Sequence, residues 1–222
     1  CLSGAAVMAG QHSFAAEQQK AVTMDEVVVS ATRTEKTLAD VPADVSVITR
    51  EDLQRKNYVN VNEALETIPG VMSYSGTGIS PGPPASAVVN LRGFHGAMRS
   101  MIMINGQPIS PFMYAASLVH WSAIPVDSIE RIEVVRGPSS ALHGSDAVSG
   151  VIHIITRSGE GGSATSLTVR GGNYGRRDGI LSVSGGGEEA SFGMTLSRYV
   201  TDGVLPLNNA HDNTVLTGKA SF

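Results

Sequence analysis

The C-terminal part of the sequence alternates apolar residues with small or polar ones, and this pattern limits the possible folds most strongly. Side chains of a β-strand point alternately to opposite faces, so the pattern predicts antiparallel strands with one apolar and one polar face. After Gly159 it runs through four segments, Leu167–Arg170, Ile180–Ser184, Phe192–Ser197 and Leu216–Phe222. Ile180–Leu181 and Tyr199–Val200 break the alternation, as interface positions or β-bulges would.

Two environments suit such strands. A soluble β-sandwich has one apolar and one polar face, and so does the wall of a membrane barrel, whose apolar face meets lipid. No stretch approaches the ~18 apolar residues of a membrane-spanning helix, so any membrane role belongs to strands. A barrel needs at least about 8 strands of about 9 to 11 residues, so this alternative predicts more chain beyond Phe222. Alternation alone leaves both environments open.

Residues 36–160 are predicted to form an α+β domain. Asn60 and Glu63 have the spacing of a helix cap, and the apolar residues from Val61 to Ile68 share one helical face before Pro69–Gly70. Thr49 and Asp52 repeat the cap spacing and predict a second helix over 51–56. Strands are predicted at Val45–Thr49, Val71–Tyr74, Val88–Gly93, Met101–Ile104, Ile129–Val135 and Val151–Thr156.

Two kinds of turn connect these predicted elements. Asn105–Gly106 separates two apolar runs and predicts a tight hairpin turn, because both residues tolerate positive φ. Gly137, Gly144 and Gly150 are assigned to tight turns rather than to ligand contact. Residues 110–121 read as a loop.

Composition excludes several classes of function. The formal net charge is −4 and charged residues make up 16%, so the chain has no basic field for nucleic acid. Cys1 is the only cysteine, which excludes an intramolecular disulfide and a thiolate metal site. The sequence has no nucleophile elbow or complete dinucleotide loop, and His95, His120, His143 and His153 lack a metal-ligand spacing. We therefore expect no enzyme, no cofactor and no protein-bound metal.

The N-terminal residues divide into two segments. Residues 1–16 are small and apolar, and Ser13-Phe14-Ala15 has the small-x-small pattern of a signal-peptidase site, so they resemble the end of a signal peptide. Residues 17–35 form the second segment, which begins with polar, unpatterned residues 17–24. A short β-branched run with no obvious partner follows, consisting of Asp25, Glu26, Val27, Val28, Val29 and Ser30. Such a run suits strand addition, although it is also compatible with an ordinary strand or a linker.

Several motifs in one order carry a family resemblance. The segment Asp127–Thr156, with Val-Val-Arg-Gly-Pro in its middle, closely resembles the plug signature of TonB-dependent outer-membrane receptors. Val41–Thr49, Asn62–Val71 and Asn90–Gly93 leading to Met103–Pro108 fall in the family's order. The resemblance covers about residues 25 to 160. It implies a plug with a mixed sheet at 36–160, followed at 161–222 by the first antiparallel strands of a truncated 22-stranded transmembrane barrel.

The resemblance also implies roles for particular residues. Asp25–Ser30 resembles the energy-coupling box that pairs with the periplasmic domain of TonB. Arg92 and Arg136 stand where the family has arginines that pair with barrel carboxylates. The apical loops would offer ligand contacts from Phe94, His95, Arg99, Phe112, Met113, Tyr114 and Trp121. Aromatic rings with an arginine or histidine suit an aryl, anionic iron chelate.

The implied function is TonB-dependent active uptake, by a monomer in the outer membrane of a Gram-negative bacterium. An iron–siderophore complex is the favoured ligand, and cobalamin and haem are alternatives within the family. A soluble, β-rich periplasmic binding module is the alternative outside the family. A receptor that also signals would need an additional N-terminal domain, for which residues 1–24 leave no room, and a truncated N-terminus keeps this alternative open.

Overall fold

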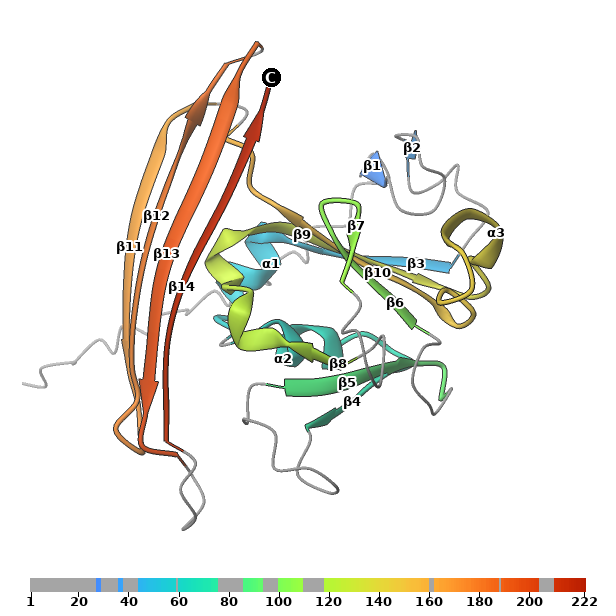
Figure 1. Ribbon diagram of the computed structural model, residues 1–222, viewed down its shortest axis with the longest axis horizontal. Helices are drawn as coiled ribbons and strands as arrows, with labels where there is room; N and C mark the ends of the chain where they lie inside the picture. Colours follow the sequence, from blue (N-terminus) through green and yellow to red (C-terminus); the bar gives the residue numbers. More distant parts are fainter. Residues whose placement is uncertain are drawn as a thin grey trace, which may run out of the picture.

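The computed structural model describes residues 27–28, 36–37, 44–58, 60–75, 86–93, 100–109, 118–159, 162–187, 189–203 and 210–222. The described residues of 44–159 form what we call the α+β domain, and those of 162–222 form what we call the long sheet (Figure 1). The α+β domain lies on the concave side of the long sheet. Two short strands, β1 (Val27–Val28) and β2 (Lys36–Thr37), pair with each other near the same end as the C-terminus.

A five-stranded mixed sheet is the centre of the α+β domain. Its strand order is β3-β9-β10-β6-β7, and only the β10–β6 pair is parallel. The strands are β3 (Asp44–Thr49), β9 (Ile129–Arg136), β10 (Gly150–Thr156), β6 (Ser100–Ile104) and β7 (Gln107–Pro108). Direct cross-strand pairing aligns Ile48, Ile132, Ile154 and Ile104 in one row, so the sheet has an aliphatic face for the core.

Two capped helices belong to this core. In α1 (Arg50–Arg55) the Asp52 amide donates to the Thr49 hydroxyl at 3.2 Å, and in α2 (Val61–Glu66) the Glu63 amide donates to the Asn60 side chain at 2.9 Å. Both predicted caps are confirmed. The predicted apolar face of α2 is confirmed as well, because Val61, Ala64 and Leu65 are fully buried.

A smaller sheet lies beside the first. It has the order β4-β5-β8, with β4 (Val71–Ser75), β5 (Ser86–Leu91) and β8 (Leu118–His120). Two 3₁₀ turns, η2 (Trp121–Ala123) and η3 (Val126–Ser128), lead from β8 into β9. The sequence predicted a loop at 110–121, so β8 corrects part of that prediction. The strand is only three residues long and pairs with β5 alone, which leaves little periodicity to recognise.

The predicted tight turns occur where the backbone needs them. Asn105 and Gly106 have φ values of 48° and 80°, which is the type I′ geometry expected for a two-residue hairpin between β6 and β7. Gly150 begins β10 with φ 143°, and a Cβ there would overlap the Val135 carbonyl oxygen. A short helix, α3 (Ser140–His143), occupies the connection between β9 and β10.

The long sheet consists of four antiparallel strands in sequential order. They are β11 (Ala164–Gly171), β12 (Arg177–Gly186), β13 (Ser191–Thr201) and β14 (His211–Ser221). Leu167, Leu181, Leu196 and Leu216 are directly paired across all four strands, and each is at least 42% exposed. On the opposite face Ser182 pairs with Thr195, and both are buried toward the α+β domain. The predicted alternation of an apolar and a polar face is therefore confirmed.

The expected breaks in alternation have a simpler cause than β-bulges. The register between β12 and β13 is continuous from Arg177 to Gly186. Ile180 points inward and is 1% exposed, whereas Leu181 points outward with the leucine row. The pair therefore places one apolar residue on each face of a regular strand, and Ile180 is buried on the inner side.

Candidate functional site

The predicted coupling box is described only at its centre. Val27 and Val28 form β1 and pair with Thr37 and Lys36 in an antiparallel register. Asp25, Glu26, Val29 and Ser30 lie outside the described residues. The described part of the box is thus extended, with β2 on one of its edges.

The two predicted arginines converge on one carboxylate. Arg136 Nη2 lies 2.5 Å from Asp44 Oδ1, and Arg92 Nη2 lies 3.0 Å from Asp44 Oδ2. Arg136 also donates to the Pro69 carbonyl oxygen and the Ser46 hydroxyl, each at 2.8 Å. The hydrogen bond from Arg136 holds the pKa of Asp44 below its ordinary value, with a smaller contribution from Arg92.

This geometry gives the two arginines a carboxylate partner within the α+β domain. Among the described residues that partner is Asp44, on β3, and pairing with barrel carboxylates stays a prediction. The reason is register, because β3 pairs with β9 so that Asp44 lies directly beside Arg136. Arg92 reaches the same carboxylate from the turn after β5, where it has φ 54°.

The predicted ligand contacts fall into two groups. Phe94, His95, Arg99, Phe112, Met113 and Tyr114 lie outside the described residues. Trp121 is 2% exposed and belongs to the main hydrophobic core of the α+β domain. The structure therefore gives Trp121 a packing role, and we do not retain it among the ligand contacts.

Polar contacts join the α+β domain to the long sheet. Arg170 on β11 lies 3.3 Å from Asp127 in η3, and Thr168 donates to the same carboxylate at 3.5 Å. Arg157, just after β10, donates to the Ser184 hydroxyl on β12 at 2.9 Å. The close approach depends on Gly193, because a Cβ there would be only 2.5 Å from the Arg157 carbonyl oxygen.

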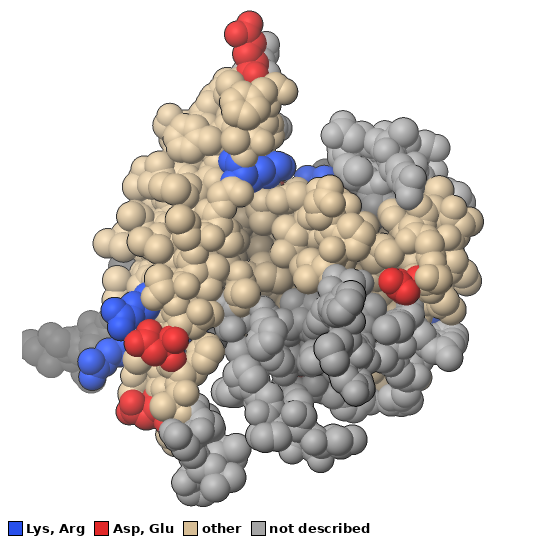
Figure 2. All heavy atoms as spheres, viewed as in Figure 1, with Lys and Arg blue, Asp and Glu red and all other residues tan. Residues whose placement is uncertain are grey.

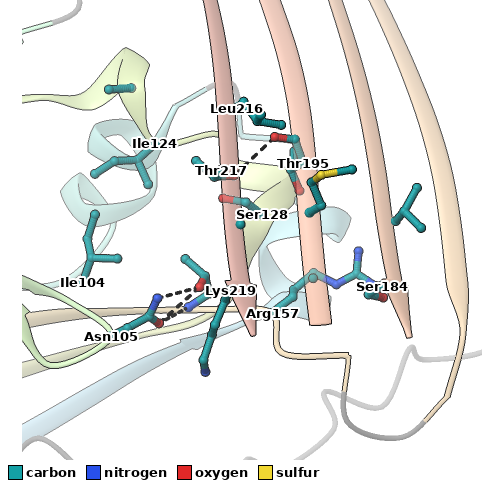
Figure 3. Close-up of a pocket in the computed structure, with 16 residues that line it drawn as sticks. Ile104, Asn105, Ile124, Ser128, Arg157, Ser184, Thr195, Leu216, Thr217 and Lys219 are labelled. Carbon is teal, nitrogen blue, oxygen red and sulfur yellow. Dashed lines mark hydrogen bonds between the residues drawn. The ribbon is translucent and has the colours of Figure 1, made fainter. Parts of the chain in front are cut away.

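A cavity of about 320 Å³ separates the two parts beside these contacts. Figure 3 shows Ile104, Asn105 and Ile124 of the α+β domain on one side and Thr195 and Thr217 of the long sheet on the other. Asn105 is held in place because its side chain binds Thr156, donating from Nδ2 to the Thr156 hydroxyl at 2.8 Å. Sequence reasoning did not find this cavity, since its lining comes from segments about a hundred residues apart.

A buried charged group on the central sheet was also missed. Glu133 is fully buried, and Arg131 Nε donates to it at 2.8 Å. His153 lies beside Glu133 in the register and accepts a hydrogen bond at Nε2 from the Gly106 amide at 2.8 Å. Burial lowers the pKa of His153 below its ordinary value, while the Glu133 carboxylate opposes that shift. The neutral imidazole is therefore the form that fits this site.

The described residues offer no cluster of three or more His, Cys, Asp or Glu side chains for a metal ion. Among the helices that the structure describes, none has the length and apolar character needed to cross a membrane.

Comparisons with known proteins agree on one family. The model of the family "TonB-dependent Receptor Plug Domain" matches residues 37–151. The vitamin B12 transporter BtuB of Vibrio vulnificus is 34% identical over 184 residues, which are 77% of this chain and 29% of the relative. An iron-regulated outer membrane virulence protein of Vibrio cholerae is 36% identical over 151 residues, which are 65% of this chain and 22% of the relative.

A solved structure shows the same arrangement. The siderophore receptor PirA from Pseudomonas aeruginosa superposes with a TM-score of 0.58 at 29% identity, covering 82% of this chain and 32% of that receptor. The chain thus spans about a third or less of the length of these relatives.

Proposed function

The chain belongs to the family of TonB-dependent receptor plug domains, and from this premise we propose that it serves active uptake of a scarce ligand across the outer membrane. The family places it in the outer membrane of a Gram-negative bacterium. The match over residues 37–151 carries the proposal, since it begins in β2 and covers the α+β domain as far as β10.

The long sheet is proposed to be the beginning of a 22-stranded barrel around the α+β domain. Its exposed leucine row would face lipid, and its serine and threonine face would line the lumen, as in transmembrane barrels. The position of the α+β domain on the concave side supports this arrangement (Figure 1).

TonB is the proposed energy-coupling partner. β1 is a short extended segment, and main-chain hydrogen bonds to an added strand would supply much of the grip. Ligand binding at the apical loops would shift the coupling box toward exposure at the periplasmic side, where TonB would bind it as an added strand. Force derived from the inner-membrane proton gradient would then move or partly unfold the α+β domain, without nucleotide hydrolysis by this chain.

The proposed ligand is an iron–siderophore complex. The similarity to an iron-regulated protein and to a siderophore receptor supports it. Cobalamin is the second candidate, because the similarity to a vitamin B12 transporter extends over 77% of this chain. Haem remains an alternative within the same class of metal complexes.

A deletion strain separates these ligands. We expect loss of growth on one or more ferric siderophores as sole iron source, and unchanged growth of a cobalamin-requiring host on vitamin B12. The reverse pattern would assign cobalamin. Normal growth on every iron source and on vitamin B12 would contradict the uptake proposal.

The coupling step has its own test in Val28→Pro. Proline removes one backbone donor from the box, so we expect uptake of the radiolabelled ligand to fall to background while cell-surface binding is retained. Val28→Thr is the matched control, because it keeps the amide and the β-branched shape. Wild-type uptake by Val28→Pro would contradict the assignment of the box.

A further inference from the structure

Two cavities adjoin between the α+β domain and the long sheet. The first has about 320 Å³ and the second about 780 Å³. They share lining residues from both sides, which are Asn105, Thr156, Arg157, Ser184 and Lys219. The shared lining makes them parts of one space, which we call the interface passage.

The lining of the larger cavity contains more basic than acidic side chains. Arg50, Arg131, Arg157 and Lys219 come from α1, β9, the segment after β10, and β14. The acid in its lining is Glu130, whose Oε2 lies 3.7 Å from Arg50. The buried Glu133 balances Arg131. Blue atoms gather where the upper part of the long sheet meets the α+β domain in Figure 2.

Arg157 and Lys219 lie in this lining without an ion-pair partner among the described residues. Arg157 donates one hydrogen bond to the Ser184 hydroxyl. Burial and then the nearby Arg50 lower the pKa of Arg157, while Glu130 and Asp127 oppose that shift. A partly buried guanidinium has five donors and gains most from an anionic oxygen, and among the described residues no carboxylate lies within ion-pair distance of Arg157. In Figure 3 both residues lie at the shared lining, with the Arg157 side chain extending toward Ser184 and the Lys219 side chain extending in another direction.

We propose that the interface passage contains an anion-binding subsite, formed by Arg157 and Lys219, for the carboxylate-type oxygens of an anionic iron chelate. The subsite rests on the proposed uptake function and narrows its ligand class. A cationic passage favours an anionic chelate over a corrinoid without net charge, because the same field that attracts one has little effect on the other. Phosphate oxygens share this chemistry and must be distinguished by experiment.

The reaction rates of charged thiol reagents with an introduced cysteine report the electrostatic potential inside the interface passage. Ala164 lines the larger cavity and is exposed, so Ala164→Cys in a Cys1→Ser background of the intact protein provides the probe site. We expect an anionic methanethiosulfonate to react faster there than a cationic one. Arg157→Gln combined with Lys219→Gln should lower the anionic-to-cationic rate ratio by about ten-fold, because two nearby charges are removed.

Matched controls keep the result specific. Arg177→Gln removes an exposed arginine of β12 that does not line the passage, and Ala141→Cys places the thiol on α3. Arg177→Gln should leave the anionic-to-cationic rate ratio at Ala164→Cys unchanged. The double glutamine variant should leave the ratio at Ala141→Cys unchanged. Arg157→Lys with Lys219 intact should preserve it, which separates lost charge from lost folding. An unchanged ratio in the double glutamine variant would overturn the subsite.

Protection experiments identify the anion. Citrate, a soluble polycarboxylate, should slow modification at Ala164→Cys at least about three-fold in wild type and have no effect in the double glutamine variant. Protection only by inorganic phosphate, or only by phosphatidylglycerol vesicles, would overturn the chelate assignment, as would no protection at all. These rates do not depend on transport, so a failed growth panel and a failed subsite are separate results.

Discussion

At the scale of single residues, charge partners are decided by register. Asp44 receives both Arg92 and Arg136 because β3 begins beside the end of β9, and the turn after β5 carries Arg92 to the same place. His153 is fixed in the same way, with Glu133 next to it on β9 and the Gly106 amide donating to its ring. The motifs that predicted functional arginines contain no information about Asp44, which lies 48 residues from Arg92 and 92 residues from Arg136.

His153 makes the β6–β7 hairpin sensitive to acid. Its pKa is lowered in the folded state, so its contribution to stability is complete above the ordinary value of 6.5 and is lost as pH falls through the folded value. We expect faster hydrogen exchange at the Gly106 amide as pH falls below about 6.5, after correction for intrinsic exchange.

His153→Phe should remove this dependence and cost about 1 kcal/mol at neutral pH, because the Gly106 amide loses its acceptor. His153→Gln, which can accept the same hydrogen bond, is the control. An acid response that persists in His153→Phe would assign the titration to another group.

At the scale of elements, sequence motifs predict a helix end or a turn correctly where neighbouring residues stabilise it. The caps of α1 and α2 and the Asn105–Gly106 turn depend on residues within three positions, and all three are found where predicted. β8 has no such local signal and exists through pairing with β5. Trp121 carries an aromatic ring that suits ligand contact or core packing equally, and only burial in the domain selects packing.

Gly150 is a point where two elements approach too closely for a side chain. We expect Gly150→Ala to lower the free energy of unfolding by about 2 to 4 kcal/mol, because φ is positive and the Cβ would overlap the Val135 carbonyl. Gly93→Ala also has positive φ, yet its Cβ would have open space, so about 1 kcal/mol is expected. Chemical denaturation of both variants tests the difference, and equal costs would count against a steric cause.

The leucine row gives the long sheet a testable outer face. Leu196→Arg should reduce assembly of the protein in the outer membrane, since an arginine facing lipid costs about 2 to 4 kcal/mol near the bilayer midplane. Ser182→Arg places the same charge on the inner face. There the obstacle to the arginine is crowding by the α+β domain, and lipid plays no part.

Heat-modifiable mobility in detergent gels reports assembly for Leu196→Arg. Leu196→Met is the matched control and should assemble normally. Normal assembly of Leu196→Arg would indicate that this face does not meet lipid.

At the scale of the whole molecule, a few polar contacts hold the α+β domain against the long sheet. Asp127→Ala removes the partner of Arg170 and Thr168, both on β11, and should cost about 1 kcal/mol of docking because the pair is only partly buried. We expect faster trypsin cleavage after Arg157, which lies on the connection between the two parts. Asp212→Ala removes an exposed pair within the long sheet and should leave cleavage unchanged.

The sequence by itself determined the local structure and the family. Alternation placed the strands of the long sheet, cap spacings placed two helices, and the motif around Arg136 identified the plug, since each signal is contained in neighbouring residues. The tertiary structure alone decided which groups meet: Asp44 with both arginines, Asp127 with Arg170, and the cations of the interface passage. The reason is physical, because strand pairing and docking bring together residues whose separation along the chain leaves no periodic trace.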